Sequence, residues 1–392
     1  MTGLTTTFKE KARALEPKLV EMRRELHRHP ELSNEEFETT RRIRAWLSEA
    51  GVPTAELKLP TGVLAEVKGA HPGPTIMLRA DIDALPVQEE TGLPFASAVA
   101  GKMHACGHDF HTVSMIGAAK LLQEQRDELH GTVRILFQPA EEQAVGARAV
   151  IEAGALDGVT AVLGMHNKPE LPVGTIGIRT GPLMASVDRF EIEVTGKGGH
   201  AGIPEATVDP VVVSSAIVGA LQTLVSRNVS PHDNAVVSVC KLQAGSSWNV
   251  IPDTGVLEGT VRTFQAEARA AIPQLMERVV THVAEGYGAK VNFKWLPMLP
   301  AVNNDAQMAE LMRSAAEAQG LQVAEAVPTM GGEDFALYQE QVPGCFIWMG
   351  TGGTEQWHHP KFTLNEDAIK ISAALFAEAA VRALALALKQ AQ

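Results

Sequence analysis

The chain has 392 residues, of which 45% are hydrophobic and 20% are charged, and its formal net charge is −12. This is the composition of a globular protein that is too long for one ordinary core, so we expect two or three folding units. The negative charge argues against a nucleic acid or an anionic membrane as a partner and favours a small soluble substrate.

The first predicted elements are a helix and three buried strands. Apolar residues at positions 8–26 recur at steps of four and three, which predicts an amphipathic helix that covers a sheet. Short apolar runs at residues 75–78, 132–137 and 161–165 indicate buried strands, and a helix is expected around residues 113–125. This alternation of strands and helices predicts an α/β domain with a mainly parallel sheet flanked by helices.

Ionisable side chains follow each of the three strands. Asp81 and Asp83 follow the first strand, Glu141 and Glu142 follow the second, and His166 ends the third. Open α/β sheets place their ligands at the carboxyl ends of the strands. Three strand ends therefore point to one site.

From about residue 186 the pattern changes to a second module. A strand, a helix, two strands, a helix and a strand are predicted at residues 189–195, 208–226, 235–242, 255–264, 267–288 and 290–295. This βαββαβ order is that of a ferredoxin-like α+β module. Because sequence of catalytic type resumes after it, we expect a catalytic domain in two parts, residues 1–185 and 296–392, with a lid domain inserted at residues 186–295.

Targeting signals and a disulfide pattern are both missing from the sequence. No signal-peptide core follows the charged N-terminus, and the apolar stretch at residues 373–388 is shorter than the ~20 residues of a membrane span. We expect that stretch to be a packing helix. Cys106, Cys240 and Cys345 are scattered and odd in number, which does not suggest disulfides. The sequence predicts a cytoplasmic protein with thiols free to bind metal.

Cys106 and His108 are one residue apart in a glycine-containing loop, a spacing that can direct both side chains toward a metal ion. Alone, the pair is more often a buried thiol followed by a helix-capping histidine. Together with Glu142 and His166, however, it supplies thiolate, imidazole and carboxylate donors. Such a set suits zinc, manganese or cobalt and is not one that magnesium or calcium would select.

Adjacent glutamates can divide two tasks at a metal site. Glu142 could bind the ion, while Glu141 stays unliganded and moves protons for the metal-activated water. Acidic residues are also expected in a first helical turn from the helix dipole alone. Likewise, Asp83 could cap a loop or accept a ring N–H from a ligating histidine, and a lone histidine such as His166 more often packs in a core. The joint occurrence favours metal-dependent hydrolysis.

Taken in order and spacing, the motifs resemble those of the N-acyl-amino-acid amidohydrolases. This is the hippurate hydrolase and indoleacetyl-amino-acid hydrolase group of dinuclear metallopeptidases, related to aminoacylase and glutamate carboxypeptidase. The likeness covers nearly the whole chain and is carried by residues 26–33, 79–86, 103–109, 139–142, 198–201, 249–253, 331–335 and 358–360.

The resemblance implies two divalent ions held by five ligands, namely Cys106, His108, Glu142, His166 and a C-terminal histidine. Cys106 stands where some relatives carry a bridging carboxylate. His358 takes the histidine position of the family pattern, although His359 is an alternative and either could be a plain loop residue. Glu141 is implied as the general base, and Asp83 as the carboxylate that orients a metal-bound histidine.

Three residues of the inserted module are also implied. His200 would stabilise the oxyanion upon domain closure, often from a partner subunit, although the preceding glycines could simply mark a turn. Asn249 and Arg262 would hold the substrate amide and α-carboxylate, and a guanidinium suits a carboxylate geometrically. Without the resemblance, Arg262 would be taken for a surface strand residue. Glu333, in a loop expected to line the pocket, has no assigned role.

The sequence thus predicts a dinuclear amidohydrolase that cleaves N-acyl amino acids or short peptides and forms a homodimer or higher homo-oligomer through the inserted module. The alternatives are a metallo-carboxypeptidase or dipeptidase, a non-catalytic metal-binding homologue, and a cysteine hydrolase with Cys106 as nucleophile and His108 as base. The acyl group, the amino acid and the metal stay open, because pocket shape decides among substrates that present the same amide and carboxylate.

Overall fold

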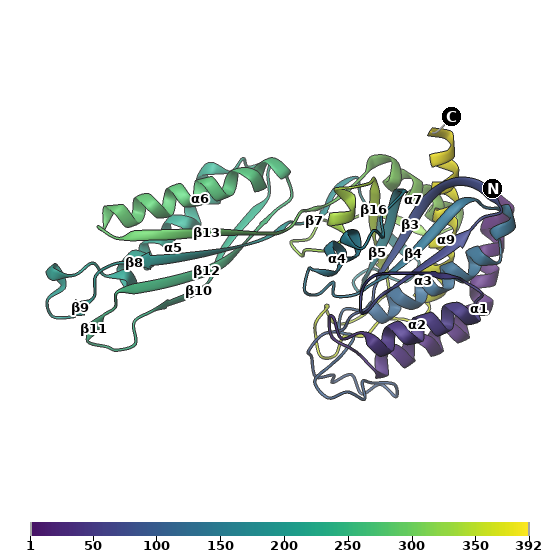
Figure 1. The fold of residues 1–392 in the computed structure, drawn as a ribbon, viewed down its shortest axis with the longest axis horizontal. Helices are drawn as coiled ribbons and strands as arrows, with labels where there is room; N and C mark the ends of the chain where they lie inside the picture. The colour runs from purple at the N-terminus through teal and green to yellow at the C-terminus, as the bar shows by residue number, and fades with distance from the viewer. Residues whose placement is uncertain (1, 391–392) are drawn as a thin grey trace. The chain divides into compact units, whose positions relative to one another are not determined.

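The structure is a computed structural model that describes residues 2–390, with side chains from residue 8 onward. The chain forms two compact units (Figure 1). Unit 1 contains the chain up to Leu183, Asn303–Val327, and the chain from Asp334 onward. Unit 2 contains Met184–Val302 and Pro328–Glu333, so it interrupts unit 1 in the sequence.

Unit 1 is built on an eight-stranded sheet in the order β1-β2-β4-β3-β5-β16-β6-β15. Its strands are β1 (Thr54–Ala55), β2 (Val63–Lys68), β3 (His71–Asp81), β4 (His130–Gln138), β5 (Val159–Lys168), β6 (Thr175–Ile178), β15 (Gln322–Glu325) and β16 (Gly344–Gly350). The four central strands, β4, β3, β5 and β16, are mutually parallel. The predicted mainly parallel sheet is confirmed, and the three predicted strands are neighbours at its centre.

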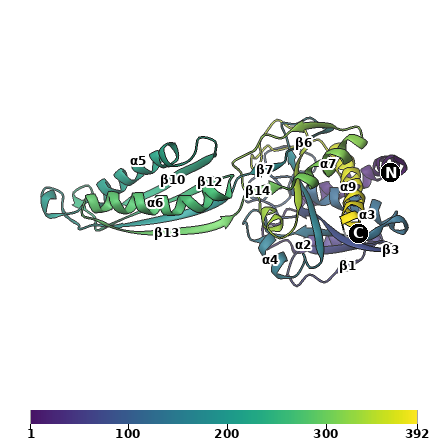
Figure 2. The same cartoon turned by 90° about the horizontal axis from the view of Figure 1, so that it is seen from above.

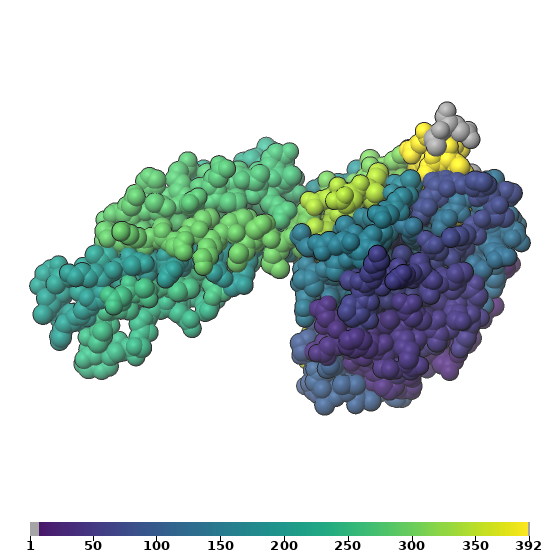
Figure 3. All heavy atoms as spheres, in the orientation of Figure 1, coloured from purple at the N-terminus to yellow at the C-terminus, as the bar shows by residue number. Residues whose placement is uncertain are grey.

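Helices cover this sheet in two layers. The helices of unit 1 are α1 (Thr2–Arg28), α2 (Phe37–Glu49), α3 (His108–Gln123), α4 (Gly146–Glu152), α7 (Ala306–Ala318), α8 (Ala336–Gln339) and α9 (Ala368–Gln390). α3 and α9 pack on β3, and α1 packs on α3 and α9. The N-terminal segment, purple in Figure 3, accordingly forms a broad part of the surface of unit 1.

The expectation that the opening helix covers the sheet is therefore wrong in one respect. α1 covers the two helices that cover the sheet, and its apolar face meets them rather than the strands. The reason lies in α3, whose residues are buried on nearly every side. A Cβ built at Gly117 of α3 would lie 2.9 Å from Leu19 of α1 and 2.8 Å from Ala373 of α9, so three helices meet closely at this glycine.

Two helices, α5 (Pro210–Asn228) and α9, are long and apolar enough to cross a membrane by length and composition. Core helices of soluble proteins can be equally long and apolar. α9 packs against α1, α3 and β3, and 61% of its most apolar window is buried inside the protein. Its apolarity therefore serves packing, as the sequence predicted.

Unit 2 has the predicted βαββαβ order. Its main elements are β8 (Val187–Thr195), α5, β10 (Ala235–Ala244), β12 (Thr254–Thr263), α6 (Ala266–Gly286) and β13 (Lys290–Leu299). The strands form an antiparallel sheet in the order β10-β12-β8-β13. α5 and α6 run side by side against it (Figure 2). α5 begins at Pro210, where the Asp209 carboxylate accepts the Val211 N–H at 2.8 Å and caps the helix.

The remaining elements are short. They are β7 (Gly181–Met184), β9 (Gly199–His200), β11 (Val250–Ile251), β14 (Val302–Asn304) and the 3-10 helices at Arg126–Glu128 and Pro204–Ala206. β9 and β11 form a separate two-stranded sheet, in which His200 lies opposite Val250.

Candidate metal centre and active site

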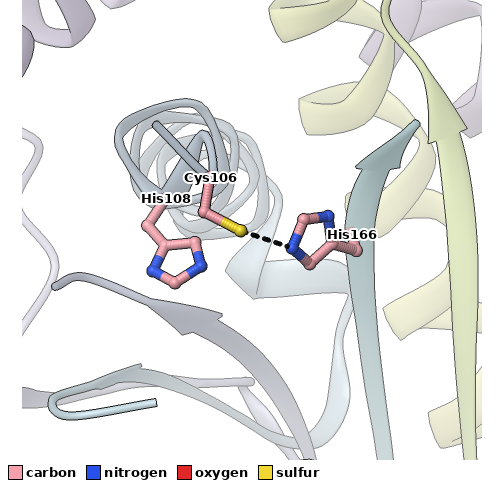
Figure 4. A group of neighbouring side chains, drawn as sticks. All are labelled: Cys106, His108 and His166. Atoms are coloured by element: carbon pink, nitrogen blue, oxygen red, sulfur yellow. Dashed lines mark hydrogen bonds between the residues drawn. The ribbon is translucent and has the colours of Figure 1, made fainter. Parts of the chain in front are cut away.

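Cys106 and His108 lie at the start of α3, where the chain turns into the helix. Gly107 adopts φ +84°, and a Cβ at that position would meet the Asn167 side chain at 2.5 Å, so glycine is required for both the turn and the packing. Figure 4 shows the Cys106 thiol and the His108 ring near the ring of His166, which comes from β5. The ligand atoms of these three buried residues lie within 4.8 Å of one another.

The unprotonated Nε2 of His166 faces the Cys106 thiol and accepts its hydrogen bond. The His166 Nδ1–H donates to the Asn167 carbonyl at 2.9 Å, which leaves Nε2 unprotonated, 3.3 Å from the Cys106 Sγ (Figure 4). Burial, together with the Glu142 and Glu141 carboxylates, raises the pKa of the Cys106 thiol well above its usual value. Without a cation this thiol is neutral and a poor nucleophile, which argues against the cysteine-hydrolase alternative. A bound metal ion would favour the thiolate.

Asp83 holds His108 and the glutamate turn at once. Its Oδ1 lies 3.1 Å from Nδ1 of His108, and its Oδ2 accepts the Glu142 N–H at 3.1 Å and the Ser33 hydroxyl at 2.7 Å. Burial opposes protonation of His108, but Asp81, Asp83 and Glu142 raise its pKa to about 10. The site around His108 therefore favours a positive charge, as expected of a place where a cation binds.

Two buried atoms of this site face each other without a hydrogen-bond partner among the described residues. They are Nε2 of His108 and Oε1 of Glu142, which lie 3.8 Å apart. Buried polar atoms are rarely left unpaired. Burial raises the pKa of Glu142 to about 7, although His108 and the Cys106 thiol act to lower it. The nitrogen, carboxylate and sulfur donors gathered here fit a divalent transition-metal ion.

The two C-terminal histidines lie differently. Nε2 of His358 is 3.5 Å from Oε1 of Glu142, and its ligand atom groups with those of Glu142 and Cys106 within 4.8 Å. The His359 ring accepts the Lys361 N–H at 3.1 Å and faces Glu355 at 3.6 Å. Of the two, only His358 is brought to the other candidate ligands.

Glu141 and Glu142 lie in a turn that precedes α4, so they are not in a first helical turn as dipole-driven acidic residues would be. Ligand atoms of Glu141, Glu142 and His108 lie within 4.8 Å of one another. The adjacent carboxylates therefore both reach the cluster. This arrangement allows one to bind an ion and the other to move a proton.

The model of "Peptidase family M20/M25/M40" matches residues 77–382. The chain belongs to this family. As an M20/M25/M40 member it is 59% identical to an N-acetylcysteine deacetylase of Bacillus subtilis, over 94% of this chain and 97% of the relative. It is also 51% identical to an N-acetyl-L-cysteine deacetylase of the same organism, over 94% of this chain and 89% of the relative.

A solved structure supports the same family assignment. The crystal structure of a dinuclear metal-binding peptidase of the M20 family from Bacillus subtilis matches with a TM-score of 0.88 and 55% identity. The match covers 95% of this chain and 99% of that chain. This M20/M25/M40 member is therefore a metal-dependent amidohydrolase, as the motifs predicted, and the clustered donors together with this neighbour support a site for two divalent ions.

The residues predicted in the inserted module fall into two places within unit 2. His200 and Asn249 are exposed and adjacent, because the Ala201 N–H donates to the Asn249 carbonyl across β9 and β11. Arg262 lies on β12, eight residues after Thr254. At the rise of an extended strand, this places it about 26 Å from the Thr254 end of β12, which is the end near β11. It is half-buried, and its Nη1 has no hydrogen-bond partner among the described residues.

A buried network of hydrogen bonds and ion pairs beneath the site was not predicted from the sequence. His111 Nδ1–H donates to Asp81 at 2.6 Å, and its Nε2 accepts the Asn167 N–H at 2.9 Å, so neither ring nitrogen is left for a metal. Arg79 pairs with Asp81 at 2.5 Å and with Asp334 at 2.7 Å in a fully buried cluster. The available signals were Asp81 at the strand end and Asp334 in the motif at residues 331–335. Neither signal revealed the pairing.

Proposed function

We propose that this enzyme hydrolyses the amide bond of N-acyl amino acids, releasing a carboxylate and a free amino acid. The observation that carries the proposal is the pair of unpartnered buried atoms, Nε2 of His108 and Oε1 of Glu142, opposite each other in a cluster that also contains Cys106, His166 and His358. Together with the family relationship, this donor set supports a dinuclear hydrolytic site.

In this proposal the metal ligands are Cys106, His108, Glu142, His166 and His358. Two ions bound there would supply Lewis acidity, which polarises a carbonyl and makes water a better nucleophile. Zinc, manganese and cobalt all suit the mixed sulfur, nitrogen and oxygen donors. The Cys106 thiol belongs to two donor groups, one with His108 and His166 and one with Glu142 and His358, so it would help to hold both ions.

Glu141 is the proposed general base. Its carboxylate would accept a proton from the attacking water and deliver that proton to the departing amine nitrogen. Asp83 would hold His108 through Nδ1, which keeps Nε2 as the coordinating atom.

His200, Asn249 and Arg262 are proposed to bind the substrate. His200 would stabilise the developing oxyanion, and Asn249 would hold the amide. Arg262 would pair with the α-carboxylate, which its unpartnered Nη1 supports. We further propose that the inserted module contacts a second copy of the chain, and that the enzyme acts in the cytoplasm.

The test is a release assay with purified enzyme, using matched N-acetyl and N-benzoyl amino acids and dipeptides with zinc, manganese or cobalt. The names of the two bacterial relatives suggest that N-acetyl substrates, N-acetylcysteine among them, will give the highest kcat/KM. Cleavage of dipeptides without cleavage of any N-acyl amino acid would replace the proposal with the dipeptidase alternative. Metal binding without hydrolysis of any substrate would favour a non-catalytic homologue.

A further inference from the structure

The turn that carries Glu141 and Glu142 has an unusual backbone. It begins at Ala140, which adopts φ +53°, a left-handed conformation that residues other than glycine seldom adopt. The turn closes tightly, because the Gly146 N–H donates to the Ala140 carbonyl at 3.1 Å and a Cβ at Gly146 would lie 1.7 Å from the Pro139 carbonyl oxygen. Such a conformation persists only where the surrounding structure holds it.

The segment that follows α1 makes the contacts that hold this turn. Oε1 of Glu36 accepts the Ala140 N–H at 2.9 Å. The Ser33 hydroxyl donates to Asp83, and the same Asp83 oxygen accepts the Glu142 N–H. The Asn34 amide donates to Gln143 Oε1 at 3.2 Å. Three residues of this segment, Ser33, Asn34 and Glu36, thus reach three points of the turn, about 100 positions away in the sequence.

A plain structural explanation for Glu36 does not suffice. It stands at the N-cap position of α2, where a side chain ordinarily accepts an N–H of its own helix, yet it makes no such bond. It is fully buried, and its second oxygen, Oε2, has no hydrogen-bond partner within residues 8–390. Burial raises the pKa of Glu36, although nearby backbone N–H groups, that of Ala140 among them, act to lower it.

We propose that Glu36 is a positioning residue for catalysis. By fixing the Ala140 amide it sets the course of the turn, so that the Glu142 carboxylate binds metal and the Glu141 carboxylate accepts the proton. Ser33 assists through Asp83. The inference rests on the proposed function of Glu141 and Glu142. Since Glu36 lies behind the turn, it acts through the backbone and not on the substrate.

The experiment compares four metal-loaded full-length variants on the best N-acetyl substrate. Glu36→Ala removes the acceptor, Glu36→Asp withdraws it by one methylene, and Glu36→Gln keeps a neutral acceptor at the same reach. The matched control is Glu35→Gln, because Glu35 is the exposed neighbour, paired only at the surface with Lys102 at 2.8 Å. Metal content, kcat, KM and Tm are measured for each.

Positioning predicts that kcat falls roughly 10- to 100-fold in Glu36→Ala and Glu36→Asp, as for a small misplacement of a catalytic group. KM and the two bound ions are retained, and Glu36→Gln recovers most of the lost rate. A requirement for negative charge alone predicts rescue by Asp and not by Gln, and that result overturns the proposal. An unchanged kcat in Glu36→Ala, corrected for the folded fraction, also overturns it.

Glu141→Gln, assayed beside these variants, separates the two levels of inference. Loss of turnover in Glu141→Gln with normal kcat in Glu36→Ala leaves the proposed function intact and removes the positioning role. Normal turnover in Glu141→Gln removes the proposed function itself. If Glu36→Ala fails to fold, the comparison of Glu36→Asp with Glu36→Gln carries the same distinction.

Discussion

Asp83 and His108 are joined by a contact of 3.1 Å between Oδ1 and Nδ1, at the carboxyl end of β3. The other oxygen of Asp83 accepts the backbone N–H of Glu142. One buried carboxylate therefore sets the position of both residues whose unpartnered atoms face each other across the site. A histidine on a helix and a glutamate on a turn are thereby held at the same candidate metal site.

Replacing Asp83 should weaken metal binding without removing a ligand. In the wild type, the two Asp83 oxygens divide His108 and the Glu142 amide between them. Asn has only one side-chain oxygen, so in Asp83→Asn either His108 or the Glu142 amide loses its partner. We expect metal affinity to fall about 10- to 100-fold, as for other groups that orient metal-bound histidines. Titration with a competing chelator measures this. The control is Asp127→Asn, whose side chain is 89% exposed, and equal affinity in both variants would contradict the assignment.

Removing the proton acceptor should stop turnover while leaving the metals in place. In Glu141→Gln we expect kcat to drop at least about 100-fold, because general-base catalysis contributes roughly that much. Metal content, read by inductively coupled plasma mass spectrometry, should stay at the wild-type value. Glu152→Gln, on the exposed surface of α4, serves as the control. A Glu141→Gln enzyme that turns over at the normal rate would show that another group takes the proton.

The adjacent histidines of the C-terminal loop form their own matched pair. His358→Ala should lower the metal occupancy and the activity, because His358 lies 3.5 Å from Glu142. His359→Ala should change neither, since that ring faces Glu355 and the Lys361 amide. Metal analysis of both variants decides between them. The reverse pattern would assign the ligand to His359.

A buried ion pair next to the site should make stability depend on pH. Asp109 accepts from Arg23 and from His27, each at 2.8 Å, and all three are buried. Breaking such a pair leaves a buried charge, so Asp109→Asn should lose about 3–5 kcal/mol of unfolding free energy. Urea denaturation of the metal-free protein measures this loss.

The sign of the pH effect follows from two opposite shifts. Burial opposes ionisation, but Arg23 and His27 hold the pKa of Asp109 far below its usual value, so its contribution is complete above about pH 4 and is lost as the pH falls below that. Burial and Arg23 oppose protonation of His27, but Asp109 and Glu89 raise its pKa, so its contribution is lost as the pH rises above about 6.5. The difference between wild type and Asp109→Asn should therefore peak between these limits. A pH-independent difference would contradict the pairing.

Local patterns in the sequence were sufficient for much of the fold. Apolar runs predicted β3, β4 and β5, and the order of elements predicted the βαββαβ unit, because periodicity and turn residues are local properties of the chain. The layer position of α1 was not predictable in this way. An amphipathic stripe shows that a helix has a partner, but does not show whether the partner is a strand or another helix.

Local patterns likewise predicted some residues of the candidate site but not the long-range contacts that support them. Cys106, Glu142 and His166 could be singled out, since each follows or ends a predicted strand or opens a helix. The pairing of Arg79 with Asp334 joins residues 255 positions apart, and that of Glu36 with Ala140 joins residues 104 apart. No local pattern contains such contacts, because they depend on how the packed elements meet.

The measurement that tests the account most directly is removal and return of metal. The enzyme is dialysed against a chelator until no metal is detected, assayed on an N-acetyl amino acid, and then titrated with zinc, manganese or cobalt. We predict that activity disappears with the metal and returns with it, reaching its maximum at two ions per chain, as the dinuclear relative suggests. Full activity in protein verified to be free of metal would contradict the central claim.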